Sequence, residues 1–244
     1  MLGRGLQQDQ NGNWVLTKLF EVCDEKGAHL PTALPEDDDN PNSCIGGSEL
    51  NILAGVELYK YFHPAMTVFA YGMRSNYLRN INAPSECVVG TKKFLEIARE
   101  EGETPEVEIF REGEWNQPTS GTDAEIHNIF SLVLAPDLQI ANVAIVTVAV
   151  HVPRTALMVQ GHMQNPEFAG RIFPQIYVAE QILETADPEQ YAGLWARSIG
   201  SQSFTRTFQR EIGFGGVYPR GGVNAYFAGI RQTDSSKVPA AAGI

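Results

Sequence analysis

The side chains best suited to chemistry follow one strongly apolar run. Residues 143–150 are apolar or small except for Thr147, and His151 and Arg154 come soon after them. A run that is hydrophobic on both alternating faces predicts a central parallel strand. In an open parallel α/β sheet, ligands bind where such a strand ends and the next helix, here residues 155–162, begins. We therefore place the candidate site at this junction, where a histidine and an arginine near a helix start suit an anionic ligand.

Two roles are open for His151. An imidazole with an unperturbed pKa near neutrality can act as a general acid or base, or it can only donate a hydrogen bond to an anion. Arg154 is expected to hold a carboxylate or phosphate through bidentate hydrogen bonds. Both side chains also have structural uses, as a helix cap and as the partner of a surface carboxylate.

A second polar cluster opens a predicted helix at residues 119–134. If Thr122 begins this helix, Glu125 and Asn128 lie one turn apart on the same face. Glu125 could then bind ribose hydroxyls or an α-amino group, and it joins His151 as a candidate catalytic residue. The spacing of Thr122 and Glu125 is also that of a capping box, which needs no ligand.

Glycines mark further turns at which backbone N–H groups can approach a ligand. They complete the candidate binding set, which comprises Gly3, Arg4, Gly5, Gly46, Gly47, Gly72, Thr122, Glu125, Asn128, Thr147, His151 and Arg154. No metal is expected, because the sequence has no P-loop, no His-Glu-x-x-His and no Cys-x-x-Cys. The three cysteines lack metal-type spacing and are expected to be reduced thiols.

Composition narrows the class of protein. The chain has 244 residues, of which 43% are hydrophobic, and this length and composition suit one α/β domain with an appended segment. Its formal net charge is −11. An acidic protein is not expected to bind nucleic acid or an anionic membrane, since both need a basic surface. No signal peptide and no membrane-length apolar run is visible. We expect a cytoplasmic protein with a small-molecule partner, whose apolar C-terminal helices could form a homodimer interface or a lid.

The order of the predicted elements is that of an α/β protein. Strands are expected at residues 65–72, 105–110 and 143–150, and helices at 13–23, 48–62 (with Ser48 as N-cap), 82–101, 119–134 and 155–162. This alternation predicts right-handed parallel crossovers and a three-layer Rossmann-like sandwich with a mostly parallel sheet. Residues 173–183 and 188–199 are expected to be helical. The predicted division is a domain at 1–164, a mainly helical C-terminal extension at 165–229 and a flexible tail at 230–244.

Together, the clusters resemble the YdcF/SanA/ElyC-like domain family, whose function is uncharacterised. The matching pieces, within about residues 1–162, are Ile45-Gly-Gly47, Ala54-Gly-Val-Glu-Leu-Tyr59, Ala70-Tyr-Gly72, Ser85-Glu86, Thr122-Asp-Ala-Glu-Ile-His-Asn128 and Ile145-Val-Thr-Val-Ala-Val-His-Val-Pro-Arg-Thr155. The last two are the specific part. The chain departs from the family in three places: almost no strand precedes Gly3, the link at 111–120 is longer, and the segment after Gln164 has no counterpart in compact members.

The resemblance implies a Rossmann-like fold whose pocket is lined by the N-terminal glycines, the Thr/Glu/Asn helix start and the His/Arg turn. It implies a soluble small-molecule enzyme or binder that holds a nucleoside-containing ligand. S-adenosylmethionine is the first candidate, because the cytoplasmic branch of the family is linked to it. An enzyme of this kind would be a transferase using S-adenosylmethionine, or would act on an adenosyl or phosphorylated small molecule. The alternatives are a metal-assisted phosphoester or pyrophosphate hydrolase and a non-catalytic regulatory protein.

Overall fold

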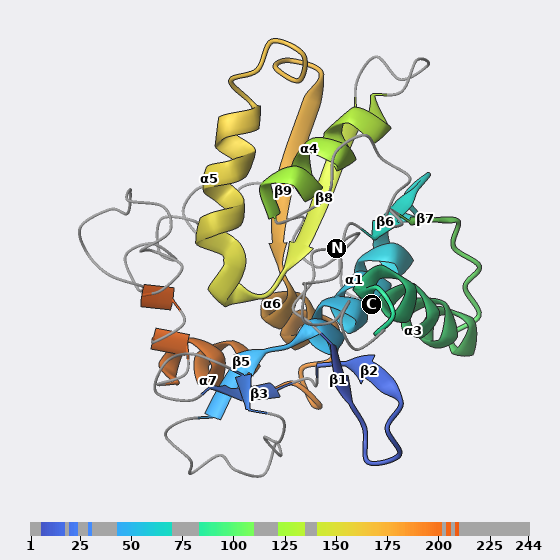
Figure 1. Ribbon diagram of the computed structural model, residues 1–244, viewed down its shortest axis with the longest axis vertical. Helices are drawn as coiled ribbons and strands as arrows, with labels where there is room; N and C mark the ends of the chain where they lie inside the picture. The colour runs from blue at the N-terminus through green and yellow to red at the C-terminus, as the bar shows by residue number, and fades with distance from the viewer. Residues whose placement is uncertain are drawn as a thin grey trace.

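The computed structural model describes residues 6–17, 20–23, 29–30, 43–69, 83–109, 122–134, 141–201, 204–205 and 208–209. Helices and strands alternate through most of these residues, and helices connect the parallel strands (Figure 1). The chain is therefore an α/β protein, as the sequence predicted.

Two parallel strand pairs carry the fold. β6 (Thr67–Phe69) pairs with β7 (Val107–Ile109), and α3 (Glu86–Glu100) forms the crossover between them. β8 (Ala141–Thr147) pairs with β9 (Ile172–Val178), and η1 (Ala149–His151) and α5 (Val152–His162) lie between them in the chain.

The strand predicted at residues 143–150 is β8, and its parallel pairing is confirmed. It ends at Thr147, and the next residues form the short 3-10 helix η1 instead of continuing the strand. Burial on both faces holds only for the second half, because Ile145 and Val146 are buried whereas Asn142 and Ala144 are exposed. The strand therefore enters the core only toward its carboxyl end, where the candidate site begins.

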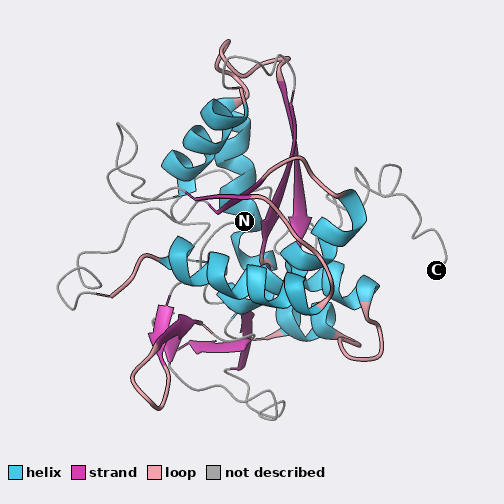
Figure 2. Ribbon diagram, turned by 90° about the vertical axis from the view of Figure 1, so that its right-hand side faces the viewer, coloured by secondary structure: helices cyan, strands magenta, loops and turns pink. Residues whose placement is uncertain are grey.

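The helices pack in two groups. α1 (Ser48–Phe62) contacts α3 and α6 (Ala179–Ala186), α6 contacts α7 (Leu194–Gly200), and α4 (Thr122–Val133) contacts α5. Figure 2 shows the short antiparallel strands on one side of the helices, apart from the long β8–β9 pair. Among the described helices, none is both long and apolar enough to cross a membrane.

The N-cap of α1 differs from the prediction. Gly47, not Ser48, is the N-cap, and Ser48 is the first helical residue. The cap function comes from a distant residue: Thr17 Oγ1 accepts a hydrogen bond from Ser48 N at 2.9 Å, and Thr17 O accepts one from Glu49 N at 3.1 Å. The Ser48 hydroxyl does not cap the helix and bonds Glu86 instead.

The helix predicted for residues 13–23 is wrong. These residues contribute to β2 (Trp14–Leu16), which is antiparallel to β1 (Leu6–Gln8), and to β3 (Phe20–Cys23), which is antiparallel to β4 (His29–Leu30) and β5 (Ser43–Gly46). The turn before β2 is the physical reason. Gly12 has a φ of +80°, and Asp9 Oδ1 accepts hydrogen bonds from the N atoms of Asn11 and Asn13 at 2.8 Å each. An Asn-Gly turn of this kind favours a hairpin over a helix.

The helix predicted for residues 173–183 is also wrong in its first half. Residues 172–178 form β9, and the helix α6 begins only at Ala179. Pro174 lacks an N–H and disfavours a helix interior, while the β-branched Ile176 and Val178 suit a strand. The predicted helix at 188–199 is shorter than expected, since α7 spans Leu194–Gly200. The parallel sheet thus continues beyond residue 164, and the predicted division of the chain at that residue stays a prediction.

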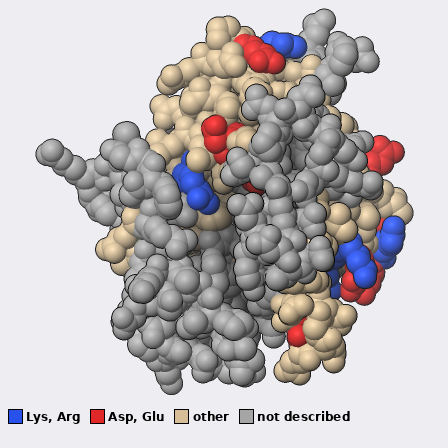
Figure 3. Space-filling view, viewed as in Figure 1, with Lys and Arg blue, Asp and Glu red and all other residues tan. Residues whose placement is uncertain are grey.

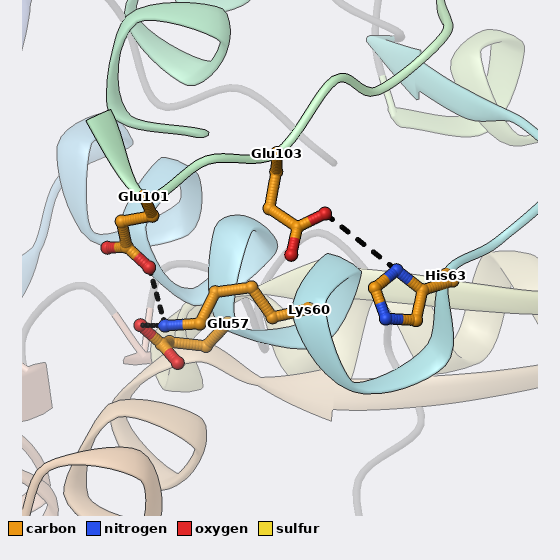
Figure 4. A network of polar contacts seen from close by, with 5 residues as sticks. All are labelled: Glu57, Lys60, His63, Glu101 and Glu103. Atoms are coloured by element: carbon orange, nitrogen blue, oxygen red, sulfur yellow. Dashed lines mark hydrogen bonds and ion pairs between the residues drawn. The ribbon is translucent and has the colours of Figure 1, made fainter. Parts of the chain in front are cut away.

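A polar network joins the C-terminal ends of α1 and α3 (Figure 4). Lys60 Nζ lies 3.0 Å from Glu57 Oε1 and also contacts Glu101, and His63 Nδ1 lies 3.8 Å from Glu103 Oε2. Burial lowers the pKa of Lys60, but its contacts with Glu101 and Glu57 outweigh burial and raise the pKa overall. The network fixes the helix ends that lie farthest from the candidate site.

Candidate functional site

The candidate site draws its residues from the first turns of four helices. α1 begins at Ser48, α3 at Glu86, α4 at Thr122, and α5 directly after His151. Ser48 Oγ donates a hydrogen bond to Glu86 Oε1 at 2.8 Å, which links the starts of α1 and α3. Glu125, in the first turn of α4, feels the charges of both Glu86 and Arg154. Glu125 therefore lies within electrostatic reach of residues that begin α3 and α5, whereas the start of α4 itself contacts the end of α5, where His162 Nε2 lies 2.9 Å from Asp123 Oδ1.

Of the predicted binding residues that the structure describes, His151 and Arg154 are in direct contact, and Glu125 lies within electrostatic reach of Arg154. Gly46 ends β5 and Gly47 caps α1; Thr122, Glu125 and Asn128 lie along the start of α4; Thr147 ends β8; His151 and Arg154 lie at the start of α5. Gly3, Arg4, Gly5 and Gly72 lie outside the described residues. The contact between His151 and Arg154 is the part of the predicted grouping that the structure shows directly.

The carboxyl of Glu125 has a strongly raised pKa. Burial of its carboxyl raises the pKa of Glu125 to about 8; the nearby carboxylate of Glu86 adds to the increase, and the Arg154 charge opposes it. Near neutral pH the carboxyl is therefore largely protonated and can donate as well as accept a hydrogen bond. A carboxyl with a pKa close to the working pH can also transfer protons efficiently.

His151 and Arg154 contact each other. Arg154 Nη2 lies 3.2 Å from His151 Nε2, and because a guanidinium can only donate, Nε2 is the acceptor in this contact. His151 is buried, whereas Arg154 is partly exposed. The imidazole therefore orients the guanidinium, and its Nε2 is not free to take up a proton while the contact lasts. Basic and acidic side chains meet on the surface over α4 and α5 (Figure 3).

Three buried polar side chains near the helix starts have no hydrogen-bond partner among the described residues. They are Asn128, through Nδ2, and Thr147 and Thr155, each through Oγ1. Asn128 lies one turn beyond Glu125 on the same face of α4, and Thr155 follows Arg154 on α5. Burying an unpaired polar group costs about 1–3 kcal/mol, so each is a candidate contact for a bound molecule.

The amides at the start of α1 are not available to a ligand. Ser48 N and Glu49 N already donate to Thr17, as described above. Gly46 and Gly47 therefore line this part of the site without offering those two N–H groups.

Glu180 is a buried acidic residue near His151 that the sequence analysis did not single out. It is buried at the start of α6, where its Oε2 accepts a hydrogen bond from Ala149 N at 2.9 Å and its Oε1 accepts one from Ser198 Oγ at 3.1 Å. These bonds hold η1, and hence His151, against α6 and α7. An acidic residue two positions after the end of a strand could have indicated this role, but residues 173–183 were predicted to form one helix. Ser48 and Glu86 were missed because each looked like an ordinary helix-start residue.

No protein-family model, curated protein or solved structure matches the chain. Within the described part of the chain, no three His, Cys, Asp or Glu side chains are grouped so that they could hold a metal ion. The geometry around Glu125 and Arg154 is therefore the basis on which a function can be argued.

Proposed function

We propose that the chain binds a small anionic molecule that contains a nucleoside, at the helix starts around Glu125 and Arg154. The observation that carries this proposal is the partly buried Glu125, whose pKa of about 8 leaves it largely protonated near neutral pH, within electrostatic reach of the cationic Arg154. A neutral carboxyl next to a guanidinium can donate to a ligand hydroxyl or oxygen while the guanidinium binds a carboxylate or phosphate. Among common binding groups, such a pair suits a ligand with both hydroxyl and anionic groups.

The roles of the individual residues follow from their contacts. Arg154 binds the anionic group, and His151 orients Arg154 through Nε2. Asn128 and Thr147 supply further hydrogen bonds, because their buried polar atoms lack partners among the described residues. Should the bound molecule react, Glu125 is the proposed proton-transfer group.

The ligand class comes from the resemblance to YdcF-like proteins, which we retain as a proposal. It makes S-adenosylmethionine the first ligand to test. We also propose that the two parallel pairs belong to one Rossmann-like sheet in a three-layer sandwich. Cytoplasmic location is part of the same proposal and is compatible with the buried Cys87 thiol, which forms no disulfide.

The test is a thermal-shift measurement with S-adenosylmethionine, S-adenosylhomocysteine, ATP, ADP and inorganic phosphate, each with and without Mg²⁺. A ligand at about 100 times its Kd stabilises the folded state by roughly 3 kcal/mol, which raises Tm by several degrees. We expect this rise with the two adenosyl compounds. A rise only with phosphates and Mg²⁺ would instead favour the hydrolase alternative.

Two variants locate the binding. Arg154→Gln should abolish the rise in Tm, because the anionic group loses its bidentate partner. Arg171→Gln is the matched control, since Arg171 is exposed and donates only to Glu167 O at 3.3 Å. Equal responses of the two variants, or no response of the unaltered chain to any compound, would reject the proposed site.

A further inference from the structure

A cleft of about 290 Å³ separates one face of α1 from the face that β8 and β9 share. On the helix side it is lined by Gly55, Leu58, Tyr59 and Phe62. Their spacing of three and four residues places them on one face of α1. None of the predicted binding residues that the structure describes lines the cleft, so what binds there is independent of the ligand proposed above.

The register of β8 and β9 defines the sheet side of the cleft. Directly paired residues of neighbouring strands lie on the same face, as do alternate residues of one strand. The cleft-lining residues on this face form three pairs: Asn142 with Phe173, Ala144 with Gln175, and Val146 with Tyr177. α1 reaches this face at Phe62, whose ring centroid lies 5.9 Å from that of Tyr177. Because Gly55 and Ala144 carry almost no side chain, the helix and the sheet do not fill the space between them.

The chemistry of the walls restricts what the cleft can bind. The described residues that line it include no charged side chain, and they include the aromatic side chains of Tyr59, Phe62, Phe173 and Tyr177. Phe62 and Phe173 are exposed, so a ligand can reach their rings. A bound ring gains from edge-to-face or offset contacts with such side chains, beyond the burial of its surface. A charged group would instead lose its hydration without an ionic partner in this lining.

One side-chain amide supplies a polar contact on the sheet side. Gln175 is exposed, and its Oε1 accepts a hydrogen bond from the Tyr177 hydroxyl at 2.7 Å. This bond orients the amide. Its Nε2 group carries two donors, which can reach an oxygen atom of a bound molecule.

We propose that the cleft binds a neutral aromatic compound of two fused rings that carries a hydroxyl or carbonyl oxygen. The size follows from the volume, because an apolar cavity of about 150 Å³ holds benzene and this cleft has about 290 Å³. The rings lie between α1 and the face of β8 and β9, and the oxygen accepts a hydrogen bond from Gln175 Nε2. An aliphatic chain of similar volume fits less well, because it loses more rotational freedom on binding and makes no ring–ring contact.

The test measures binding of 2-naphthol to the full chain by equilibrium dialysis, and we expect saturable binding. Naphthalene, which lacks the oxygen, and 1-decanol, which lacks the rings, should displace 2-naphthol only at several-fold higher concentrations. The anion 2-naphthoate should need at least about ten-fold more, because its carboxylate would be buried without a partner. No saturable binding of 2-naphthol, or displacement by any of the three competitors at equal or lower concentration, would overturn the proposal.

Variants place 2-naphthol in the cleft. Ala144→Phe adds a ring in the volume that the ligand needs, so it should weaken binding at least about ten-fold. Ala169→Phe, at an exposed position outside the cleft, is the matched control and should bind like the unaltered chain. Equal binding by these two variants would overturn the proposal.

A second variant tests the hydrogen bond and adds no bulk to the cleft, so it also serves should Ala144→Phe fail to fold. Gln175→Leu should abolish the preference for 2-naphthol over naphthalene and leave the affinity for naphthalene unchanged, because only the oxygen loses its donor. A Gln175→Leu chain that keeps the full preference would overturn the proposal.

Discussion

At the scale of single residues, the protonation state of Glu125 determines which charged and hydrogen-bonding groups the site offers to a ligand. Its carboxyl is partly buried, and the neighbouring carboxylate of Glu86 repels its ionised form. Glu86 itself is held in place by the hydroxyl of Ser48. Arg154 supplies the compensating positive charge but is itself engaged by His151. The site therefore combines one neutral carboxyl, one carboxylate and one guanidinium, a mixture that can bind a ligand with both donors and acceptors.

This electrostatic arrangement predicts a specific pH dependence of stability. The pKa of Glu125 is about 8 in the folded chain against an ordinary value of 4.5, so the protonated form favours folding. Its contribution is fully present below about pH 4.5 and is lost as the pH rises through 8, by up to about 1.4 kcal/mol per pH unit. Glu125→Gln should remove this decline, because an amide does not ionise.

The measurement is urea unfolding at pH 5.5 and at pH 8.5. The difference in stability between Glu125→Gln and the unaltered chain should shift in favour of the variant at the higher pH. Glu100→Gln, which changes an exposed residue of α3, is the control and should show no such shift. If the stability of all three chains changed equally with pH, burial and the charge of Glu86 would not be raising the pKa of Glu125.

Much of this residue-scale arrangement could be predicted. The motif spacing predicted Glu125, His151 and Arg154 as site residues, and the structure places His151 in contact with Arg154, because helical periodicity fixes which residues of one element share a face. Glu86 and Ser48 could not be found in the same way. Their importance arises from contact between different helices, and a local pattern carries no information about such contacts.

At the scale of elements, the errors have a common physical origin. Residues 13–23 and 173–183 contain apolar residues at helical intervals, yet both include strands. Short strands and helical turns cannot be distinguished by periodicity alone, and breakers decide between them. Gly12 and Pro174 were the deciding residues, through a positive φ and a missing N–H. The long helix α1 has the predicted bounds, and α3 begins four residues later and ends one residue earlier than predicted, because fifteen residues average out such ambiguity.

The strand β9 also explains how α6 supports the site. Because β9 ends at Val178, Glu180 lies at the start of α6, close to the backbone of η1. Its carboxyl accepts hydrogen bonds from Ala149 N in η1 and from Ser198 Oγ in α7. Glu180→Ala should destabilise the chain by about 2 kcal/mol or more, since two buried donors would lose their acceptor. Glu180→Gln, which keeps one acceptor oxygen, should lose less.

Urea unfolding measures both changes. Glu189→Ala, at an exposed position, should alter stability by no more than about 0.5 kcal/mol. Because Glu180 positions η1, Glu180→Gln should also reduce the Tm increase produced by whichever compound stabilises the unaltered chain. Identical behaviour of the variants at positions 180 and 189 would show that Glu180 does not hold η1.

At the scale of the whole molecule, the sheet crosses the boundary that the sequence suggested. β8 lies before residue 164 and β9 lies after it, and the two pair along seven residues in register. α6, also beyond the boundary, packs on α1. Composition and motif content change near residue 164, but neither property predicts which strands pair. The α/β class could be predicted because it depends on the order of elements, whereas the extent of the folded unit depends on long-range pairing.

A truncation tests whether residues 1–164 form an independent domain. A chain ending at Gln164 lacks β9, α6 and α7, so β8 loses its described partner strand and Ala149 N loses Glu180. We expect no cooperative urea transition and no near-UV circular dichroism from this chain, because the side-chain packing of Ile172, Val178 and Leu183 in the core is absent. A chain ending at residue 229, which removes only the predicted tail, should unfold cooperatively. A cooperative transition of the 1–164 chain with near-native circular dichroism would instead establish the predicted domain and make β9 an accessory strand.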